Sequence, residues 1–405
     1  MIAACRSCGS GQIHKVFSLG PAPLANQLTD GDGGDVAVAR YPLDLWVCTE
    51  CSLAQLADAP PPSVLFHDYP YLSSFSDTML AHAREMAATL IDRCALDRQT
   101  LVVEIGSNDG YLLQHFAAAG IPVLGIDPSE AACRHAAARG IETRPLFFGS
   151  VAAADLVRAG VRPRLIVANN VMAHVPDVND VVAGVRRLLP ADGIFVIETP
   201  YIRDLIAGLE FDTIYHEHVF YYSFTALTAL LARHGFTSID VARMPIHGGS
   251  LRVVAGSGST ATAAVQRLLD EEADWGVAVL TTYATFAARV DARRRELRDL
   301  LLARKRGGRR LAAYGAAAKG AMLLNALDVG GDVFDFVVDR NPVKQGHRLS
   351  GSGLPIRPPE DLLREMPDDV LLLTWNICDE ILDQQKEYRR RGGTFIIPLP
   401  EVRIV

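Results

Sequence analysis

The sequence contains no uninterrupted apolar run of the ~18–20 residues that a membrane-spanning helix requires. Its first residues, MIAACRSCGSG, also lack the basic and apolar stretches of a secretory signal, so we expect a cytoplasmic protein. Basic residues are not in excess, because 40 Lys and Arg stand against 47 Asp and Glu, giving a net charge of −7. Since binding to nucleic acid depends on neutralising phosphates, we expect neither a nucleic-acid partner nor a membrane partner.

The composition is that of a globular chain, with 49% hydrophobic and 21% charged residues. At 405 residues the chain is too long for one ordinary domain. Its motifs divide it into three regions, residues 1–75, 76–255 and 256–405. The apolar balance does not demand an oligomer, so we expect a monomer, with a homodimer as the alternative.

Four of the seven cysteines form two Cys-x-x-Cys pairs within residues 1–75. Each pair puts two thiolates on one side of a tight turn, and two facing turns supply the four sulfur ligands that a tetrahedral Zn²⁺ accepts. We therefore predict a zinc site made by Cys5, Cys8, Cys48 and Cys51. A closed set of four ligands leaves no position for a substrate, so this metal would be structural. A redox pair or disulfides are the alternatives, although a redox motif would need only one pair.

From residue 76 onward, short apolar segments alternate with helical ones, which predicts a mostly parallel, doubly wound sheet. In the middle region we expect strands at 100–105, 122–126, 164–168 and 193–198, and an antiparallel hairpin at 236–243 and 250–255. Residues 261–304 are expected to be helical. In the C-terminal region we expect strands at 310–314, 334–338, 370–374 and 394–398.

A glycine-containing loop, VVEIGSNDG, follows the first strand of the middle region and opens a helix. Gly106 and Gly110 let a ligand approach the backbone closely, and Asp127 ends the next strand, where an acid can hold both hydroxyls of a ribose. A dinucleotide site would instead read GxGxxG and cradle a pyrophosphate. The carboxylates of Glu104 and Asp109 would repel that group, and they suit the sulfonium and ammonium of S-adenosylmethionine.

We therefore predict an S-adenosylmethionine site built from this loop and from the ends of the next two strands. Its residues would be Glu104, Gly106, Asn108, Asp109, Gly110, Asp127 and Asn169. His174 follows the third strand, at the position where side chains would meet the reacting centre. A core or capping histidine is the alternative interpretation of His174.

The segment Tyr215-His-Glu-His218 carries two histidines, a glutamate and a tyrosine, with aromatic residues after it. Histidines at i and i+2 do not match the i, i+4 pair of the HExxH zinc motif, so acid–base work is favoured over a catalytic metal. A histidine held by a carboxylate is the usual general base near neutral pH. A tyrosine- and histidine-rich packing loop is the alternative.

A base at this position fits transfer of a methyl group to carbon. Oxygen and nitrogen nucleophiles already carry a lone pair, whereas a carbon must first lose a proton and does so readily only beside a carbonyl. His218 or Glu217 would take that proton while Tyr215 steadies the enolate oxygen. A methyltransferase acting on oxygen or nitrogen, or a non-catalytic zinc-bearing binding protein, remains an alternative.

The C-terminal region repeats the order of strand, glycine loop and helix in LAAYGAAAKG. This loop lacks the GK[ST] ending of a P-loop, and Lys319 is its single charged residue. Asp339 ends the next strand, and Lys344 follows it. The region would bind a phosphorylated nucleotide, with the diphosphate at the helix N-terminus beside Lys319 or Lys344. An α/β domain without a ligand is the alternative.

The chain resembles the sugar C-methyltransferase family of deoxysugar biosynthesis in antibiotic-producing bacteria, whose members methylate C3 of TDP-linked 4-keto-6-deoxyhexoses. The resemblance covers essentially the whole chain and rests on CRSCGS, VCTECSLAQL, VVEIGSNDGYLL, NNVMAHVPD, IYHEHVFYYS, YGAAAKG, VDRNPVKQG and LPEVRIV. It implies a fold of class α/β, in which a class I methyltransferase Rossmann-like domain follows a small N-terminal zinc-binding module and precedes a second, C-terminal Rossmann-like α/β domain. The nucleotide sugar would lie between the outer domains.

The resemblance also implies roles for individual residues. Tyr215, Glu217 and His218 match the catalytic segment of the family, with His218 as the base at C3, and His174 matches a further family histidine. Tyr69 or Tyr71 would close over the cofactor. The substrate-binding residues that we predict are Tyr222, Lys319, Asp339 and Lys344. The three regions become a zinc-binding module (1–75), a cofactor-binding methyltransferase domain (76–255), and a helical segment with a nucleotide-sugar-binding domain (256–405).

Overall fold

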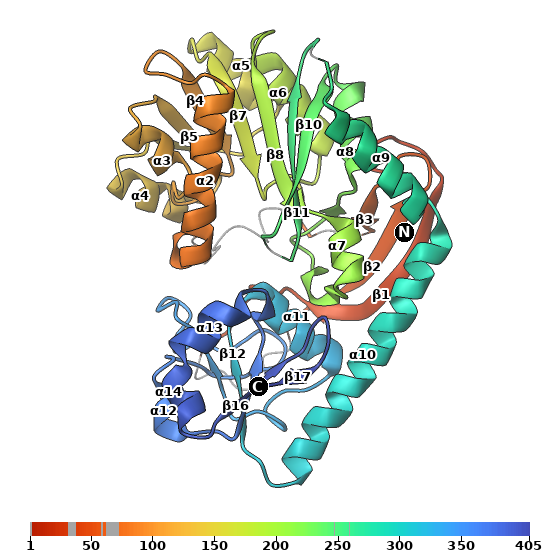
Figure 1. The fold of residues 1–405 in the computed structure, drawn as a ribbon, viewed down its shortest axis with the longest axis vertical. Helices are drawn as coiled ribbons and strands as arrows, with labels where there is room; N and C mark the ends of the chain where they lie inside the picture. The colour runs from red at the N-terminus through yellow and green to blue at the C-terminus, as the bar shows by residue number, and fades with distance from the viewer. Residues whose placement is uncertain (1, 31–37, 58–59, 62–72, 247, 259) are drawn as a thin grey trace.

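A computed structural model describes residues 2–30, 38–57, 60–61, 73–246, 248–258 and 260–405. These residues form three β-sheets, each at the centre of one part of the molecule (Figure 1). The middle domain lies above the C-terminal domain in this view, and the N-terminal sheet lies to one side, next to the long helix that connects them. In the described part of the chain, no helix is both long and apolar enough to cross a membrane.

The N-terminal sheet is antiparallel and has the order β1-β2-β3-β9. Its strands are β1 (Ile13–Pro23), β2 (Arg40–Cys48), β3 (Ala54–Leu56) and β9 (Phe220–Tyr221). The last of them comes from far downstream, since Ala54 pairs with Tyr221 and Gln55 with Phe220. The sheet of the cysteine-bearing region is therefore completed by a strand that begins two residues after the Tyr215–His218 segment.

The middle domain contains a seven-stranded sheet of order β10-β11-β8-β7-β4-β5-β6. Its strands are β4 (Leu101–Ile105), β5 (Val123–Asp127), β6 (Thr143–Pro145), β7 (Pro163–Asn169), β8 (Ile194–Pro200), β10 (Thr237–Met244) and β11 (Ser250–Gly256). β4 to β8 are parallel, and β10 and β11 form the predicted antiparallel hairpin at one end. The doubly wound sheet predicted from the alternation is therefore confirmed.

Helices connect and cover these strands. They are η1 (Ser73–Phe75), α2 (Asp77–Arg93), α3 (Leu113–Ala118), α4 (Glu130–Ala138), α5 (Ser150–Arg158), α6 (Val178–Leu188), α7 (Ile202–Ala207), η2 (Phe211–Thr213) and α8 (Phe224–Arg233). Four of them begin at a side-chain oxygen that accepts a backbone N–H of the first turn: Ser76, Ser129, Asp177 and Ser223. Such caps satisfy N–H groups that have no partner within the helix, which fixes where each helix starts.

The C-terminal domain has a six-stranded sheet of order β14-β13-β12-β15-β16-β17, parallel except for β17. Its strands are β12 (Leu311–Tyr314), β13 (Val337–Val338), β14 (Ile356–Arg357), β15 (Asp369–Leu372), β16 (Thr394–Ile397) and β17 (Arg403–Ile404). The helices of this part are α9 (Ala263–Trp275), α10 (Leu280–Arg306), α11 (Ala318–Leu327), α12 (Asp361–Glu365), η3 (Trp375–Ile377), α13 (Cys378–Gln384) and α14 (Lys386–Arg390).

Two expectations for this part need correction. The helical stretch expected at 261–304 is two helices, because Gly276 ends α9 with a φ of +82° that other residues adopt only with strain. The strand expected at 334–338 is only the two residues Val337 and Val338. The short strands β6, β14 and β17 were not expected from the pattern, since two or three residues give no readable periodicity.

The N-terminal sheet shares a hydrophobic core with each of the other two parts. Phe17 and Leu43 belong to a core that contains Leu311 and other residues of the C-terminal domain, and Phe17 stacks on Phe286 of α10 at 5.3 Å. Cys48 belongs to a second core, together with buried residues of the middle domain. The N-terminal sheet is therefore fixed to both domains and holds them in relation to each other.

Candidate active site

The four paired cysteines meet beside the end of β2. Their Sγ atoms all lie within 4.8 Å of one another, and the Cys5–Cys51 and Cys8–Cys48 pairs are each 3.6 Å apart. A Zn²⁺ ion held at ~2.3 Å by four sulfurs in a tetrahedron separates them by ~3.8 Å, so the arrangement fits this ion. All four residues are outside the cavity described next, which agrees with a structural metal.

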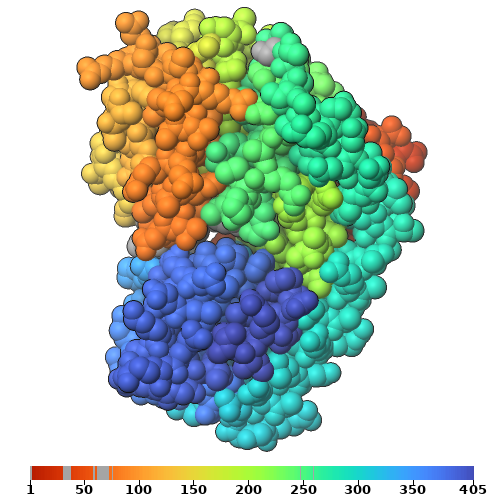
Figure 2. Space-filling view, in the orientation of Figure 1, coloured from red at the N-terminus to blue at the C-terminus, as the bar shows by residue number. Residues whose placement is uncertain are grey.

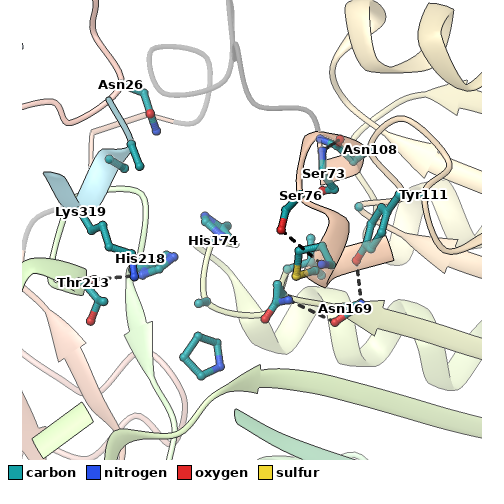
Figure 3. Close-up of a pocket in the computed structure, with 18 of the residues that line it drawn as sticks. Asn26, Ser73, Ser76, Asn108, Tyr111, Asn169, His174, Thr213, His218 and Lys319 are labelled. Atoms are coloured by element: carbon teal, nitrogen blue, oxygen red, sulfur yellow. Dashed lines mark hydrogen bonds between the residues drawn. The ribbon is translucent and has the colours of Figure 1, made fainter. Parts of the chain in front are cut away.

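A cavity of 840 Å³ lies between the middle domain and the C-terminal domain. In both parallel sheets the carboxyl ends of the strands open into it, which is the usual position of a ligand in an open α/β sheet. Figure 3 shows His174 between two groups of side chains, with Asn108, Tyr111 and Asn169 on one side and His218 and Lys319 on the other. Figure 2 shows α2 and the C-terminal domain touching on one face, with a small opening beside the contact.

Four of the predicted cofactor residues line the wall of the middle domain: Gly106, Asn108, Asp127 and Asn169. The Asp127 carboxylate accepts the backbone N–H groups of Asn108 and Ser129, both at 2.9 Å. Burial raises the pKa of Asp127, although these two hydrogen bonds oppose the effect. Gly106 has a φ of +68°, and a Cβ atom there would lie 2.2 Å from Cγ2 of Val171. The loop therefore needs glycine at this position to keep its shape.

Three other predicted cofactor residues are buried and do not line the cavity: Glu104, Asp109 and Gly110. Asp109 forms an ion pair with Arg139 at 2.9 Å. Glu104 makes no hydrogen bond within the described residues, and burial, with Asp127 and Asp109 nearby, raises its pKa well above the usual range. Glu104 is thus a buried acid one residue before the cavity wall, and its role in binding the cofactor stays a prediction.

His218 is held by two hydrogen bonds that define its protonation. Its Nδ1 lies 3.1 Å from the carbonyl oxygen of Thr213, and its Nε2 lies 2.9 Å from the hydroxyl of Tyr215. Because a carbonyl only accepts hydrogen bonds, Nδ1 carries a proton, and in the neutral form of the ring Nε2 would accept from Tyr215. The ring of His174 packs edge-on against His218 at 4.7 Å. Burial lowers the pKa of His174 to about 4, so this ring is neutral near pH 7.

Two further residues, one predicted to be catalytic and one predicted to bind the substrate, do not line the cavity either. Glu217 is buried, accepts from the amide of Asn26 at 3.0 Å, and has a pKa that burial raises. The group at Nδ1 of His218 is thus a backbone carbonyl and not the expected carboxylate. Tyr222 is also buried, and its hydroxyl donates to the carbonyl of Met172 at 3.0 Å. Tyr222 is not among the residues that line the cavity, and its role as a substrate ligand stays a prediction.

The C-terminal wall contains the other predicted substrate residues, Lys319, Asp339 and Lys344. Lys344 is buried, and its Nζ donates to the carbonyl of Ala316 at 2.8 Å. Asp339 accepts the backbone N–H groups of Ala316 at 2.7 Å and Asn341 at 2.8 Å. These two side chains therefore hold the glycine loop after β12 in shape.

Lys319 has partners from two domains. Its Nζ donates to Asn376 at 2.6 Å and lies 4.5 Å from the centre of the Trp375 ring. Burial raises the pKa of Glu210 to about 8 and that of Asp212 to about 6, while the charge of Lys319 opposes both shifts. Burial also lowers the pKa of Lys319, which these two carboxylates oppose. Lys319 therefore lies near two acidic side chains of the middle domain, of which Asp212 is the more acidic.

The two domains are also connected across the cavity by a polar contact. The hydroxyl of Thr78, in α2, donates to Glu380 of α13 at 2.7 Å. Glu380 in turn lies 3.4 Å from Arg340, whose side chain is 48% exposed. All three residues line the cavity.

Several residues of this site were missed from the sequence: Asn26, Glu210, Asp212, Thr213, Trp375 and Glu380. None lies in a recognisable motif. Asn26, Asp212, Trp375 and Glu380 gain their roles from contacts with distant parts of the chain, and Thr213 from its contact with nearby His218. Tyr69 and Tyr71, which we expected to close over the cofactor, are outside the residues that the structure describes.

Comparison with family models matches each part of the chain. Residues 5–66 match a putative zinc binding domain, residues 79–241 a methyltransferase domain, and residues 245–400 a C-methyltransferase C-terminal domain. The chain is 37% identical to the C-methyltransferase NovU of Streptomyces niveus over 100% of its own length and 97% of that protein. It is also 28% identical to a ubiquinone biosynthesis O-methyltransferase of Rhizobium etli (strain CIAT 652), over 32% of this chain and 54% of that protein.

Solved methyltransferase structures resemble part of the chain. One is the 1,6-didemethyltoxoflavin-N1-methyltransferase of Burkholderia thailandensis with bound S-adenosylhomocysteine, at 21% identity and a TM-score of 0.36, covering 50% of this chain and 94% of that one. Another is the magnesium protoporphyrin IX methyltransferase of Synechocystis PCC 6803 with bound SAM, at 15% identity and a TM-score of 0.34, covering 45% and 82%.

Proposed function

Because this chain belongs to the S-adenosylmethionine-dependent C-methyltransferases, we propose that it methylates C3 of a TDP-linked 4-keto-deoxysugar. Its cofactor is S-adenosylmethionine, and its cluster of four cysteines binds zinc. The observation that carries the proposal is the place of His218, whose Nδ1 faces the carbonyl of Thr213 in the same cavity as Gly106 and Asp127. This contact favours the tautomer with a lone pair on Nε2. A carbon beside a carbonyl has no lone pair until it loses a proton, so a base in this cavity fits methylation of carbon.

The proposed mechanism uses three side chains of the cavity. His218 takes the C3 proton on Nε2, while Thr213 holds the proton on Nδ1 and stabilises the resulting imidazolium. Tyr215, displaced from Nε2 by the sugar, turns its hydroxyl to the C4 oxygen and donates to the enolate. His174, neutral because its pKa is lowered by burial, is a second donor for that oxygen. S-adenosylmethionine, when bound, supplies the electrophilic methyl group.

Glu217 supports this segment without touching the substrate. Its carboxyl accepts from Asn26, which itself lines the cavity, and this contact joins the end of β1 to the loop of His218. We propose that Glu217 sets the position of His218 relative to Asn26. The catalytic role that the resemblance implies for Glu217 would then be indirect.

For the diphosphate of the nucleotide we propose Arg340. Lys319, Arg340 and Lys344 are the basic side chains among the described residues that line the C-terminal wall. Both ammonium groups already have partners, since Lys344 donates to the carbonyl of Ala316 and Lys319 donates to Asn376 beside the ring of Trp375. Arg340 is accessible, and its guanidinium group forms an ion pair with Glu380 in this structure. A diphosphate would replace Glu380 there and form stronger paired hydrogen bonds.

The proposal is tested by incubating the protein with TDP-4-keto-2,6-dideoxyglucose in deuterated buffer, with and without S-adenosylmethionine. We expect C3–H exchange without the cofactor and a product heavier by one methylene unit with it. His218→Ala should abolish both, while Cys378→Ser, a thiol remote from the histidines, should leave both unchanged. Methylation of an oxygen or nitrogen without C3–H exchange would refute carbon methylation, and binding of the cofactor without any product would refute the proposed sugar.

We further propose that this reaction belongs to the biosynthesis of an antibiotic deoxysugar in the cytoplasm. The support is the relation to NovU and the absence of membrane-spanning helices among the described residues.

A further inference from the structure

The one-turn helix η2 connects the C-terminal domain to the residue that holds the base. The carbonyl of Thr213, its last residue, accepts the Nδ1 proton of His218 at 3.1 Å. The preceding residue, Asp212, is fully buried, and its Oδ2 accepts from Nε1 of Trp375 at 2.7 Å. Trp375 belongs to η3, beyond the end of β15 in the C-terminal domain. Two hydrogen bonds and one peptide unit thus separate the C-terminal domain from the imidazole of His218.

The positive charge of Lys319 stabilises the buried carboxylate of Asp212, and with it the hydrogen bond to Trp375. A buried carboxylate is costly unless a positive charge compensates it, and Asp212 has Lys319 as its compensating cation. The ammonium of Lys319 is itself fixed, by its hydrogen bond to Asn376 and by the face of the Trp375 ring. Glu210, one turn before Thr213, shares the same charge. The C-terminal domain is therefore bound to η2 at Asp212, next to Glu210 at the N-cap.

The position of η2 affects His218 because a neutral histidine has two tautomers. With the proton on Nδ1, the lone pair is on Nε2, where Tyr215 now donates and where a substrate proton would be received. If the carbonyl of Thr213 moved away, the tautomer with its proton on Nε2 would become populated. That form has no lone pair at Nε2 and could not act as the base there. The position of one carbonyl group thus decides how much of His218 is in the form that can act as a base.

We propose that Asp212 and Trp375 are positioning residues that fix the Thr213 carbonyl and thereby hold His218 as the Nδ1–H tautomer, coupling the readiness of the base to docking of the C-terminal domain. The inference rests on the proposed role of His218 as the base. In this arrangement the domain that carries Arg340 also prepares the base, so a protein whose C-terminal domain is undocked would bind cofactor without deprotonating the sugar.

The first measurement needs no substrate. Protein labelled with ¹⁵N in its histidine rings reports the tautomer of each ring by NMR, and a His218→Asn sample assigns the His218 signals. Trp375→Phe keeps the ring but removes its N–H, and Asp212→Asn keeps the size but removes the charge. Trp275→Phe is the matched control, because Trp275 packs on Tyr283 at the end of α9, whereas the hydrogen bond to Asp212 comes from Trp375. We expect the Nε2–H signal of His218 to appear in Trp375→Phe and in Asp212→Asn, and not in Trp275→Phe.

The second measurement is C3–H exchange of the keto-sugar without cofactor, followed as a function of pH. We expect about tenfold slower exchange in Trp375→Phe and Asp212→Asn, with a shifted pH profile, unchanged affinity for S-adenosylmethionine, and a wild-type rate in Trp275→Phe. An unchanged His218 tautomer in both variants, or a loss of cofactor affinity in parallel with exchange, would overturn the inference. If the tautomer responds as expected but the wild-type protein exchanges no sugar proton, the positioning roles stand and the proposed substrate is wrong.

Discussion

The hydroxyl of Tyr215 lies 2.9 Å from Nε2 of His218, the nitrogen on which the proposed mechanism needs a lone pair. The hydroxyl that contacts Nε2 of the base is therefore the same group that we expect to stabilise the enolate. A substrate must separate the two side chains before reaction. His218 then faces the C3 proton, and Tyr215 faces the C4 oxygen.

We expect Tyr215→Phe to slow methylation about ten- to hundredfold, because the enolate oxygen loses a hydrogen-bond donor. Exchange of the C3 proton should slow by a similar factor, since both outcomes pass through the enolate. The measurement compares kcat and the exchange rate with those of the wild-type protein. A variant that exchanged as fast as the wild type would show that Tyr215 does not contact the enolate.

We expect the Gly106→Ala variant to lose most of its affinity for S-adenosylmethionine. The added Cβ atom meets Val171 at 2.2 Å, so the loop must shift. Gly140→Ala is a matched control, because Gly140 also has a positive φ, +76°, but a Cβ atom there meets nothing within 4 Å. Calorimetric titration with the cofactor should therefore separate the two variants, although both have backbone strain. Equal affinities would mean that the loop tolerates the shift.

We expect Arg340→Gln to raise KM for the nucleotide sugar about tenfold while kcat and the affinity for cofactor stay close to wild type. The exposed Arg389 on α14 offers a control of the same charge, since it does not line the cavity. Steady-state kinetics at two salt concentrations would add a check, because a contact with a diphosphate weakens as salt rises. If Arg389→Gln had the same effect as Arg340→Gln, net charge and not a specific contact would be responsible.

Acid should destabilise the protein partly through His174. Its pKa is lowered by burial to about 4 in the folded chain, against 6.5 for an ordinary histidine. As pH falls below 6.5, the unfolded chain binds a proton that the folded chain does not, so stability is lost progressively until pH 4. The full difference corresponds to about 3 kcal/mol. Melting temperatures between pH 4 and pH 7 should depend less on pH in His174→Gln, and an identical slope would contradict the assignment.

Removal of zinc should affect the base as well as stability. We expect one zinc ion per chain by metal analysis, and none in Cys48→Ser, which should also lower the melting temperature. Because β3 pairs with β9 directly after the His218 segment, C3–H exchange should fall further than cofactor affinity does. Cys378→Ser, outside the cluster, should keep its zinc and its activity. Full exchange activity in a folded, zinc-free protein would show that the metal does not affect the base.

Much of the fold was readable from local sequence patterns. The alternation of apolar strands and helices predicts the middle sheet and its hairpin because each segment is determined by its own periodicity. The cysteine spacing predicts a cluster of four thiols, and they converge in space. The glycine loop after β4 and Asp127 at the end of β5 meet at the cavity because carboxyl ends of neighbouring parallel strands share one edge.

The contacts that shape the site could not be read in this way, because they join residues far apart in the chain. Lys319 looked available to a phosphate, since its own loop has no acid, but Glu210 and Asp212 approach it from another domain. Asn26 and Glu217 are 191 positions apart. Tyr222 follows β9, and its hydroxyl donates to the carbonyl of Met172, 50 positions away, which no local pattern indicates.

The strand β9 has a further consequence, for the order in which the chain folds. The ribosome releases β1, β2 and β3 long before residue 221, so the growing chain holds a three-stranded sheet with the edge of β3 unpaired. Such an edge is a template for pairing with other chains. A fragment ending near residue 75 should therefore self-associate even with its thiols saturated by metal, and efficient production of the enzyme depends on how quickly the middle domain delivers its strand.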